Sequence, residues 1–395
     1  MRALVIDQGM NRGSLAAVRA LCDDGWTVGV GAPFPSMAGR SRATARWHFV
    51  PAAAAGIPEY VEAVKLAVAA GGYEVVFSSD DIGVLALSLN RDELDVVVPY
   101  APHDAVVRSL DKLEMTRAAE KVGLGVPTTR EADDATLAAV DRPVMVKARL
   151  HSVLKEGAPG RLDVAVARTP DEARVAVRAN AEAGVGSIIQ EVIDGDLMSF
   201  QAVVGQDGEL FGCVQQLTPR IWPPGAGSAA RSETVEVDAD LACRVERFFD
   251  ELGWFGLAQL QFIAPTDGGP PRLIDLNGRF YGSLSLAIAS GPNLPAVWAR
   301  LALGQGLCTP PLSEPGRSFQ WFSRDLRASW HHGGLPGAMG AVAATAASVH
   351  SVWRLSDPWP GLTHYGAQVR RALVRKSHAL MHLAASLFAG ERVLR

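Results

Sequence analysis

Cysteine is scarce in this sequence, and the few cysteines lie far apart. The 395 residues contain four cysteines and no C-x-x-C pair, and no histidine stands near them at the spacing of a zinc site. These absences argue against a disulfide framework and a structural zinc site, so we expect a reducing, cytoplasmic location. The cysteines are Cys22, Cys213, Cys243 and Cys308.

Long apolar runs and a strong excess of one charge are also missing. No stretch reaches the roughly 18 apolar residues of a membrane-spanning helix, and the opening "MRALVIDQGM" lacks the features of a signal peptide. The formal net charge is −4, and no basic patch with interleaved aromatic residues occurs. We therefore expect small-molecule partners and no nucleic acid.

The composition is that of an ordinary globular protein, with 48% hydrophobic and 20% charged residues. In the first hundred residues, short apolar runs ("ALVI", "TVGVG", "EVVFSSDD", "DVVVPY") alternate with helical patterns. This order predicts a parallel α/β domain over residues 1–105. Gly9 and Gly13 follow the first strand without completing G-x-G-x-x-G, so tight packing and a ligand role both fit them.

A second unit is predicted over residues 106–312. It begins with a helix capped by Asp111 and contains a small β-rich lid at about 130–195, where Thr169 and Pro170 start another helix. A hairpin over 198–216 follows, turned at Asp207 and Gly208. An amphipathic helix and the strands "GLAQLQFI" and "RLIDLN" complete the unit.

Residues 313–395 form a C-terminal extension, which we expect to be mainly helical. Its last segment, 366–388, is amphipathic and basic. A packed terminal helix fits this pattern better than peripheral association with a membrane surface or a partner, which stays open.

Polar side chains recur along the strand that ends in Arg279. Strand alternation places Leu273, Asp275, Asn277 and Arg279 on one face, with Ile274 and Leu276 on the other. The preceding strand likewise presents Gln259 and Gln261. If the two strands are neighbours, the oxygens of Gln261, Asp275 and Asn277 can converge on one hard cation such as Mg²⁺. A solvated sheet face fits the same pattern.

Two upstream lysines favour the cation site. Lys147 lies inside the apolar strand "VMVKA", where an ammonium group needs an anion, and Lys155 follows in a glycine-bearing loop. A later strand ends in Glu191, with backbone available at Ile193 and an acid at Asp196. This order predicts a nucleotide cleft that holds phosphates on the lysines, adenine at the strand end and ribose on the acid.

The order of these parts resembles the ATP-grasp superfamily, over roughly residues 1–310. The similar motifs are "DKLEMTRAAEKVGLGVPTT", "RPVMVKA", "IIQEVIDGD", "LAQLQF" and "LIDLNGR". The sequence looks closest to carboxylate-amine ligases of the carbamoyl-phosphate synthetase-like branch, and "FQWFSRDLRASW" resembles their C-terminal extensions. The resemblance implies an α/β ATP-grasp fold with a Rossmann-like N-terminal domain, a small lid and a central antiparallel sheet.

The resemblance also implies the cofactors ATP and Mg²⁺ and a set of residues that would bind them. Phosphate binding falls to lysines, adenine binding to the strand end, ribose binding to an acid, and metal binding to the polar strand. The residues are, in that order, Lys112, Lys147 and Lys155; Glu191 and the Ile193 backbone; Asp196; and Asp275 and Asn277, with Gln261 in the third metal position.

Arg279 and Arg231 would hold the substrate carboxylate and the acyl-phosphate, although a surface ion pair is the alternative for each. Gln261 stands where the family usually has a glutamate, and a neutral amide binds Mg²⁺ more weakly.

The function implied is an ATP-dependent ligase that activates a carboxylate as an acyl-phosphate and joins it to an amine, releasing ADP and phosphate. The alternative is a catalytically weakened ATP-binding regulatory or scaffold protein. A dinucleotide-dependent oxidoreductase is disfavoured by the incomplete glycine pattern. A homodimer stays open.

Overall fold

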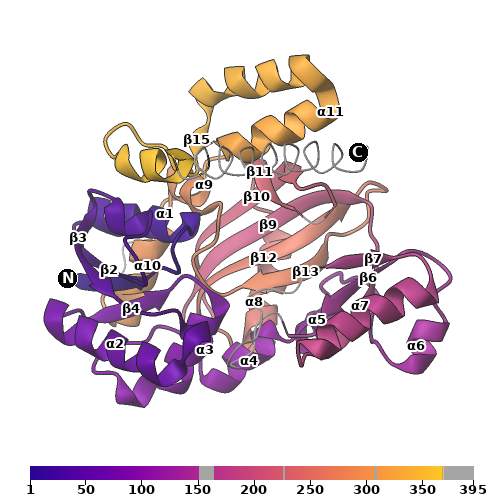
Figure 1. Cartoon of the computed structure of the whole chain (residues 1–395), viewed down its shortest axis with the longest axis horizontal. Helices are drawn as coiled ribbons and strands as arrows, with labels where there is room; N and C mark the ends of the chain where they lie inside the picture. Colours follow the sequence, from indigo (N-terminus) through magenta and orange to yellow (C-terminus); the bar gives the residue numbers. More distant parts are fainter. Residues whose placement is uncertain (151–163, 226, 307–308, 367, 369–395) are drawn as a thin grey trace, which may run out of the picture.

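The computed structural model describes residues 1–150, 164–225, 227–306, 309–366 and 368. They form a mixed α/β fold with three sheets, of which the largest occupies the centre of the molecule (Figure 1). The predicted domain boundaries at residues 105 and 312 stay predictions.

The first sheet is parallel and has the strand order β3-β2-β1-β4. The run "DVVVPY" adds only a single bridge, between Val97 and Val75, so the strand predicted there is wrong; Pro99 has no N–H group to continue a ladder. The elements are β1 (Arg2–Ile6), α1 (Arg12–Asp23), β2 (Thr27–Ala32), β3 (Thr44–Phe49), α2 (Ile57–Gly71), β4 (Val75–Ser78), α3 (Asp81–Leu89) and α4 (His103–Leu110).

Gly13 lets α1 approach the central unit closely. A Cβ atom at this position would lie 2.7 Å from the backbone carbon of Phe280 and 2.8 Å from the backbone nitrogen of Tyr281. Close backbone packing therefore accounts for this glycine.

The small sheet has the order β5-β8-β6-β7 and antiparallel pairing. Its buried residues form a hydrophobic cluster separate from the main core, centred on Val144, Val146 and Ile189. Thr169 caps α7 as predicted. The elements are β5 (Thr129–Glu131), α6 (Asp134–Ala138), β6 (Val144–Ala148), β7 (Ala165–Ala167), α7 (Pro170–Glu182) and β8 (Ser187–Glu191).

The central sheet has the order β13-β12-β9-β10-β11-β14-β15 and is antiparallel except for its last pair. The predicted hairpin is confirmed as β9 and β10, and the helices capped by Asp111 and Asp238 form as α5 and α8. The elements are α5 (Lys112–Lys121), β9 (Gly195–Val204), β10 (Leu210–Trp222), β11 (Ser228–Val235), α8 (Ala239–Leu252), β12 (Gly256–Pro265) and β13 (Arg272–Asn277).

The later part of the chain supplies helices and two short strands. Whereas a mainly helical extension was predicted, β14 pairs with β11 and carries the sheet beyond residue 312. The predicted terminal helix over 366–388 lies almost wholly outside the described residues. The elements are α9 (Leu284–Ala289), α10 (Leu294–Ala302), β14 (Ser318–Gln320), α11 (Phe322–Ala343), which is kinked at Gly334, and β15 (Val349–His350).

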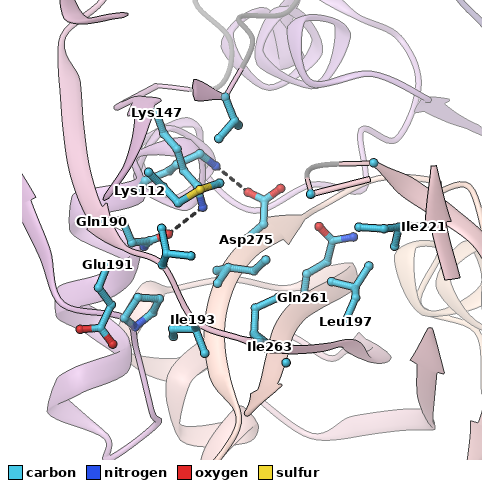
Figure 2. Close-up of a pocket in the computed structure, with 18 of the residues that line it drawn as sticks. Lys112, Lys147, Gln190, Glu191, Ile193, Leu197, Ile221, Gln261, Ile263 and Asp275 are labelled. Carbon is cyan, nitrogen blue, oxygen red and sulfur yellow. Dashed lines mark hydrogen bonds and ion pairs between the residues drawn. The ribbon is translucent and has the colours of Figure 1, made fainter. Parts of the chain in front are cut away.

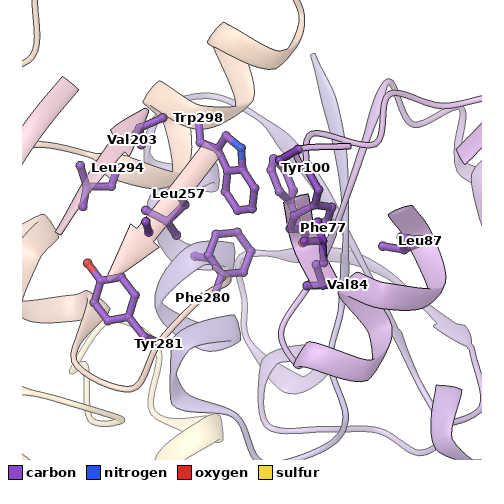
Figure 3. Packing of buried hydrophobic residues seen from close by; sticks show 14 of the residues in the cluster. Phe77, Val84, Leu87, Tyr100, Val203, Leu257, Phe280, Tyr281, Leu294 and Trp298 are labelled. Carbon is purple, nitrogen blue, oxygen red and sulfur yellow. The ribbon is translucent and has the colours of Figure 1, made fainter. Parts of the chain in front are cut away.

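Aromatic side chains join the first sheet to the central sheet (Figure 3). Trp298 of α10 lies against Phe77 of β4, with ring centroids 4.6 Å apart, and against Phe280, at 5.5 Å. The indole nitrogen of Trp298 donates a hydrogen bond to the carbonyl of Pro99. Because one continuous hydrophobic core includes both sheets, they are held in a fixed relation.

Within the described residues, no helix combines the length and hydropathy that crossing a membrane requires.

A buried ion pair ties the C-terminal extension to α1. Arg19 Nε donates to Asp357 Oδ2 over 2.9 Å, and the two side chains are 10% and 6% exposed. The Asp357 carboxylate also accepts hydrogen bonds from Ser41 Oγ and the Arg42 backbone N–H. The charges of this pair are therefore satisfied on both sides.

Replacing Asp357 by alanine leaves the Arg19 guanidinium buried without its acid. We expect Asp357→Ala to lower the free energy of unfolding by about 3–5 kcal/mol, measured by urea denaturation. The matched control is Asp23→Ala, which removes the exposed pair with Arg354 and is expected to cost less than about 1 kcal/mol. If the two variants lose the same free energy of unfolding, the Arg19–Asp357 pair is not a buried stabilising contact.

Candidate functional site

A cavity of about 260 Å³ lies where the small sheet faces the central sheet (Figure 2). Its walls are largely apolar side chains with a few polar groups among them, as in many small-molecule sites. The lining residues are Lys112, Pro127, Met145, Lys147, Ala148, Val164, Gln190, Glu191, Val192, Ile193, Gly195, Leu197, Ile221, Gly225, Gly227, Gln261, Ile263, Ile274 and Asp275.

Two lysines reach the cavity from different elements. Lys112 is the first residue of α5, which Asp111 caps, and its Nζ donates to Asp275 Oδ1 over 2.7 Å. Lys147 lies in β6, and its Nζ donates to Gln190 Oε1, also over 2.7 Å. Each lysine is 8% exposed. The predicted lysine and acid are thus brought together across a long sequence separation.

Lys147 is a buried cation whose described hydrogen-bond partner is a neutral amide. Burial, and then repulsion from Lys112, lower the pKa of Lys147 to about 8, against the attraction of Asp275. Its charge is therefore costly until another anion enters the cavity.

Asp275 and Gln261 face one another across the pairing of β13 with β12. Both line the cavity, so one carboxylate and one amide oxygen point into the same space (Figure 2). These are hard oxygen ligands of the kind that Mg²⁺ takes together with phosphate oxygens. Asn277 differs, because its amide is engaged by Gln259 and Arg279.

The predicted faces of β13 are partly wrong, because the strand contains a register shift. Asp275 pairs with Gln261 and Leu273 pairs with Phe262, so Ile274 is an extra residue. Leu273 is consequently fully buried in the core, while Ile274 lines the cavity beside Asp275. The bulge puts two consecutive side chains into one site.

The segment between β8 and β9 forms one edge of the cavity. Val192 and Ile193 lie between the two strands and both line the space. Asp196 does not: it is exposed, whereas Gly195 and Leu197 on either side of it line the cavity. Strand alternation turns Asp196 away, so the residue expected to hold ribose lies outside the described cavity lining.

Arg279 is held by an acid of α3, Asp81. Its Nε and Nη2 donate to the two carboxylate oxygens of Asp81 over 2.8 and 3.2 Å, and Nη2 also donates to Asn277 Oδ1 over 2.9 Å. The Asp81 and Asp80 carboxylates raise the pKa of Arg279 despite the opposing effect of burial. Asp81 thus orients the predicted carboxylate-binding arginine.

Sequence reasoning missed Asp81 and Gln190. Asp81 is the second acid after "FSS", just beyond the carboxyl end of β4. Ligands of parallel sheets bind at such strand ends, so this position could have marked Asp81 as a candidate site residue. Gln190 carried no signal that set it apart from its neighbours in β8.

Arg231, the other arginine predicted to bind the substrate, is not among the residues that line the cavity. Arg231 Nη1 lies 3.9 Å from Asp325 Oδ2, a fully buried carboxylate that Arg220 binds at 2.7 Å. Lys155 lies outside the described residues. The described cavity therefore brings together four of the predicted residues, Lys112, Lys147, Asp275 and Gln261, and the predicted adenine-binding residues Glu191 and Ile193 also line it.

The arrangement of these sheets and helices is similar to that of several solved structures. The L-amino acid ligase from Bacillus licheniformis superposes with a TM-score of 0.61 and 16% identity, over 80% of this chain and 78% of that chain. The chain has the ATP-grasp fold.

Two further structures share this ATP-grasp fold. The N5-carboxyaminoimidazole ribonucleotide synthetase from Thermus thermophilus has a TM-score of 0.59 and 19% identity, over 80% of this chain and 81% of that one. The biotin carboxylase domain of the Hydrogenobacter thermophilus 2-oxoglutarate carboxylase, solved with MgADP, ADP and bicarbonate, has a TM-score of 0.62 and 14% identity, over 80% and 72%. No protein-family model and no curated relative matches the sequence.

The low pKa of Lys147 predicts a pH dependence of stability. Because the folded value lies below the unfolded value of about 10.4, the unfolded chain binds more protons between these values, and stability rises with pH there. Relative to Lys147→Met, wild type should gain up to about 1.4 kcal/mol per pH unit above pH 8. Denaturation curves from pH 7 to 10 measure this difference, and a constant difference would contradict the buried cation.

Proposed function

We propose that the protein is an ATP-dependent ligase that activates a carboxylate as an acyl-phosphate and joins it to an amine. The observation that carries this proposal is the meeting of Lys112 and Lys147 with Asp275 at one end of an apolar cavity. Two cations and an acid suit phosphates and their metal ion, and the apolar slot suits a base.

In this proposal the lysines hold the phosphates of ATP. Entry of the phosphates offsets the cost of burying Lys147, which holds its proton less firmly than an exposed lysine does. Ile193 and Leu197 bracket the adenine, and the backbone between β8 and β9 meets its edge. Asp275 and Gln261 would hold Mg²⁺, which neutralises charge on the phosphates when bound.

The reaction has two steps. A substrate carboxylate oxygen takes the γ-phosphoryl group, and ADP leaves with the electrons of the broken P–O bond. The amine then bonds to the acyl carbon, the C–O bond to phosphate breaks, and the amine loses one proton. Arg279, oriented by Asp81, would position the carboxylate, since placing the reactants is most of what the protein must supply.

The lid explains how water could be kept from the acyl-phosphate. The small sheet carries Lys147 and has its own hydrophobic cluster, so it could close as a unit over the cavity. We assign small-molecule acids and amines as substrates on the size of the cavity, about 260 Å³.

A second candidate is a catalytically weakened ATP-binding regulatory or scaffold protein. The neutral Gln261 at the metal position and the exposed Asp196 favour it, because both reduce the acidic groups available to metal and ribose. The two candidates differ in turnover and share nucleotide binding.

The ligase is tested by ADP release with Mg-ATP and pools of amino acids and carboxylic acids. We expect an acid–amine pair to elicit ADP and amide, and Lys112→Met to reduce turnover by about 100-fold or more, because it removes a charge aimed at the phosphates. Lys121→Met, which changes an exposed lysine of the same helix, is the matched control. ATP binding without turnover in any pool would favour the second candidate.

Gln261→Glu adds a carboxylate opposite Asp275. We expect it to lower the Mg²⁺ concentration needed for half-maximal turnover by about tenfold, because a carboxylate binds the ion more strongly than an amide. Gln206→Glu, which makes the same change at an exposed position in the turn between β9 and β10, serves as the control. An unchanged Mg²⁺ requirement in Gln261→Glu would remove Gln261 from the metal site.

A further inference from the structure

Outside the cavity, two arginines gather on one tryptophan at the junction of α1 and the C-terminal extension. Arg12 is the first residue of α1, and its guanidinium carbon lies 3.4 Å from the centroid of the Trp321 ring. The guanidinium carbon of Arg324, near the start of α11, lies 4.9 Å from the same ring. Cation–π contact accounts for part of this arrangement.

The polar side-chain groups of Arg12, Trp321 and Arg324 are all donors, and two of these donors lack a partner within the described part of the chain. Arg12 Nη1 and Trp321 Nε1 are both buried, and neither has a hydrogen-bond partner there. An arginine and an indole N–H can only donate. Two unsatisfied donors therefore belong to one stack that also contains a second guanidinium, and the group that would satisfy them must accept hydrogen bonds.

The other buried arginines show what is missing here. Arg19 is paired with Asp357, and Arg279 with Asp81, each through a short hydrogen-bonded contact. No such acid stands beside Arg12 among the described residues. Burial, and then the charge of Arg324, lower the pKa of Arg12 to about 9, against a weaker opposing effect of Tyr365. A guanidinium left in this condition is costly.

The backbone beside Arg12 is shaped to admit its side chain. A Cβ atom on Gly282 would lie 2.5 Å from Arg12 Nη2, so a side chain at this position would displace the guanidinium from its present place. Gly282 follows Arg279 closely in the chain, and Asn11, before Arg12, donates to the carbonyl of Ser79, next to Asp80. The cluster is thus adjacent to the elements that hold Arg279.

We propose that Arg12, Trp321 and Arg324 form a binding site for an oxyanion, a carboxylate or phosphate group carried by a small molecule. The planar guanidinium and the indole N–H supply the donors, and the second guanidinium supplies charge. Assigning this oxyanion to an acidic group of the substrate rests on the proposed function, whereas the binding itself does not.

The site is tested by calorimetric titration with inorganic phosphate and, separately, with succinate, at constant ionic strength. The titrations use the Lys112→Met/Lys147→Met double variant, so that phosphate in the cavity does not contribute. We expect saturable binding of at least one of the two anions, weakened at least about tenfold by Arg12→Met. Binding of phosphate alone assigns a phosphate group, and binding of succinate alone assigns a carboxylate.

Two further measurements separate a binding site from a purely structural stack. In the absence of added anion, Arg12→Met should raise the melting temperature, because it removes a buried unpaired charge. Gly282→Ala keeps the charge but displaces the guanidinium, so it should also weaken anion binding. If neither anion binds, or if Arg12→Met lowers the melting temperature and both variants bind as the parent does, the proposal is wrong.

A separate measurement distinguishes failure of this proposal from failure of the ligase proposal. Binding of a fluorescent ATP analogue is measured on the protein with Lys112 and Lys147 intact, with and without Arg12→Met. If the protein binds the ATP analogue but neither anion, the Arg12 proposal is wrong and the ligase proposal is unaffected. If the protein binds an anion but not the ATP analogue, the ligase proposal is wrong and the Arg12 proposal is unaffected.

Discussion

The packing of Phe77, Phe280 and Trp298 fixes the relation between the first sheet and the central sheet. Phe280 directly follows Arg279, and Phe77 stands just before the segment that carries Asp81. One aromatic contact therefore sets both ends of the Arg279–Asp81 pair. A shift of one sheet against the other would break a bidentate contact whose geometry tolerates little error.

Buried cations are the second constraint on this molecule, and they differ in whether an acid lies next to them. Arg19 has a buried acid and joins parts of the chain that are far apart. Lys112 has an acid inside the cavity. Lys147 and Arg12 have no described acid of comparable closeness, and both have lowered pKa values. Since an unpaired buried charge is expensive, these two positions are where an incoming anion would gain the most.

Much of the site could be predicted, because local patterns carry it. Asp111 is a typical N-cap residue and predicts the helix that follows it. Lys147 is the one charged residue within the apolar strand "VMVKA". Strand alternation places Gln261 beside Asp275 once the two strands pair. The ATP-grasp fold follows from the order of such motifs. The bulge at Ile274 could not be read in this way, because a period of two gives no sign of where an extra residue enters.

Other features depend on contacts between distant parts of the chain. Asp81 lies 198 residues before Arg279, and no local pattern links them. The stack of Arg12 on Trp321 joins positions even further apart. Strand β3 is largely exposed and mixes charged with aromatic residues, so its sequence lacks the alternation that identifies a strand.

The pairing of β14 with β11 makes the C-terminal extension part of the central sheet and not an appendage to it. A chain shortened to its first 312 residues would expose the backbone groups of β11 as a new sheet edge, open to pairing with another molecule. The same cut would strip Asp357 from Arg19 and Trp321 from Arg12, so two guanidinium groups would lose their cover at once. The extension therefore completes the central sheet, and we do not expect the first 312 residues to fold stably without it.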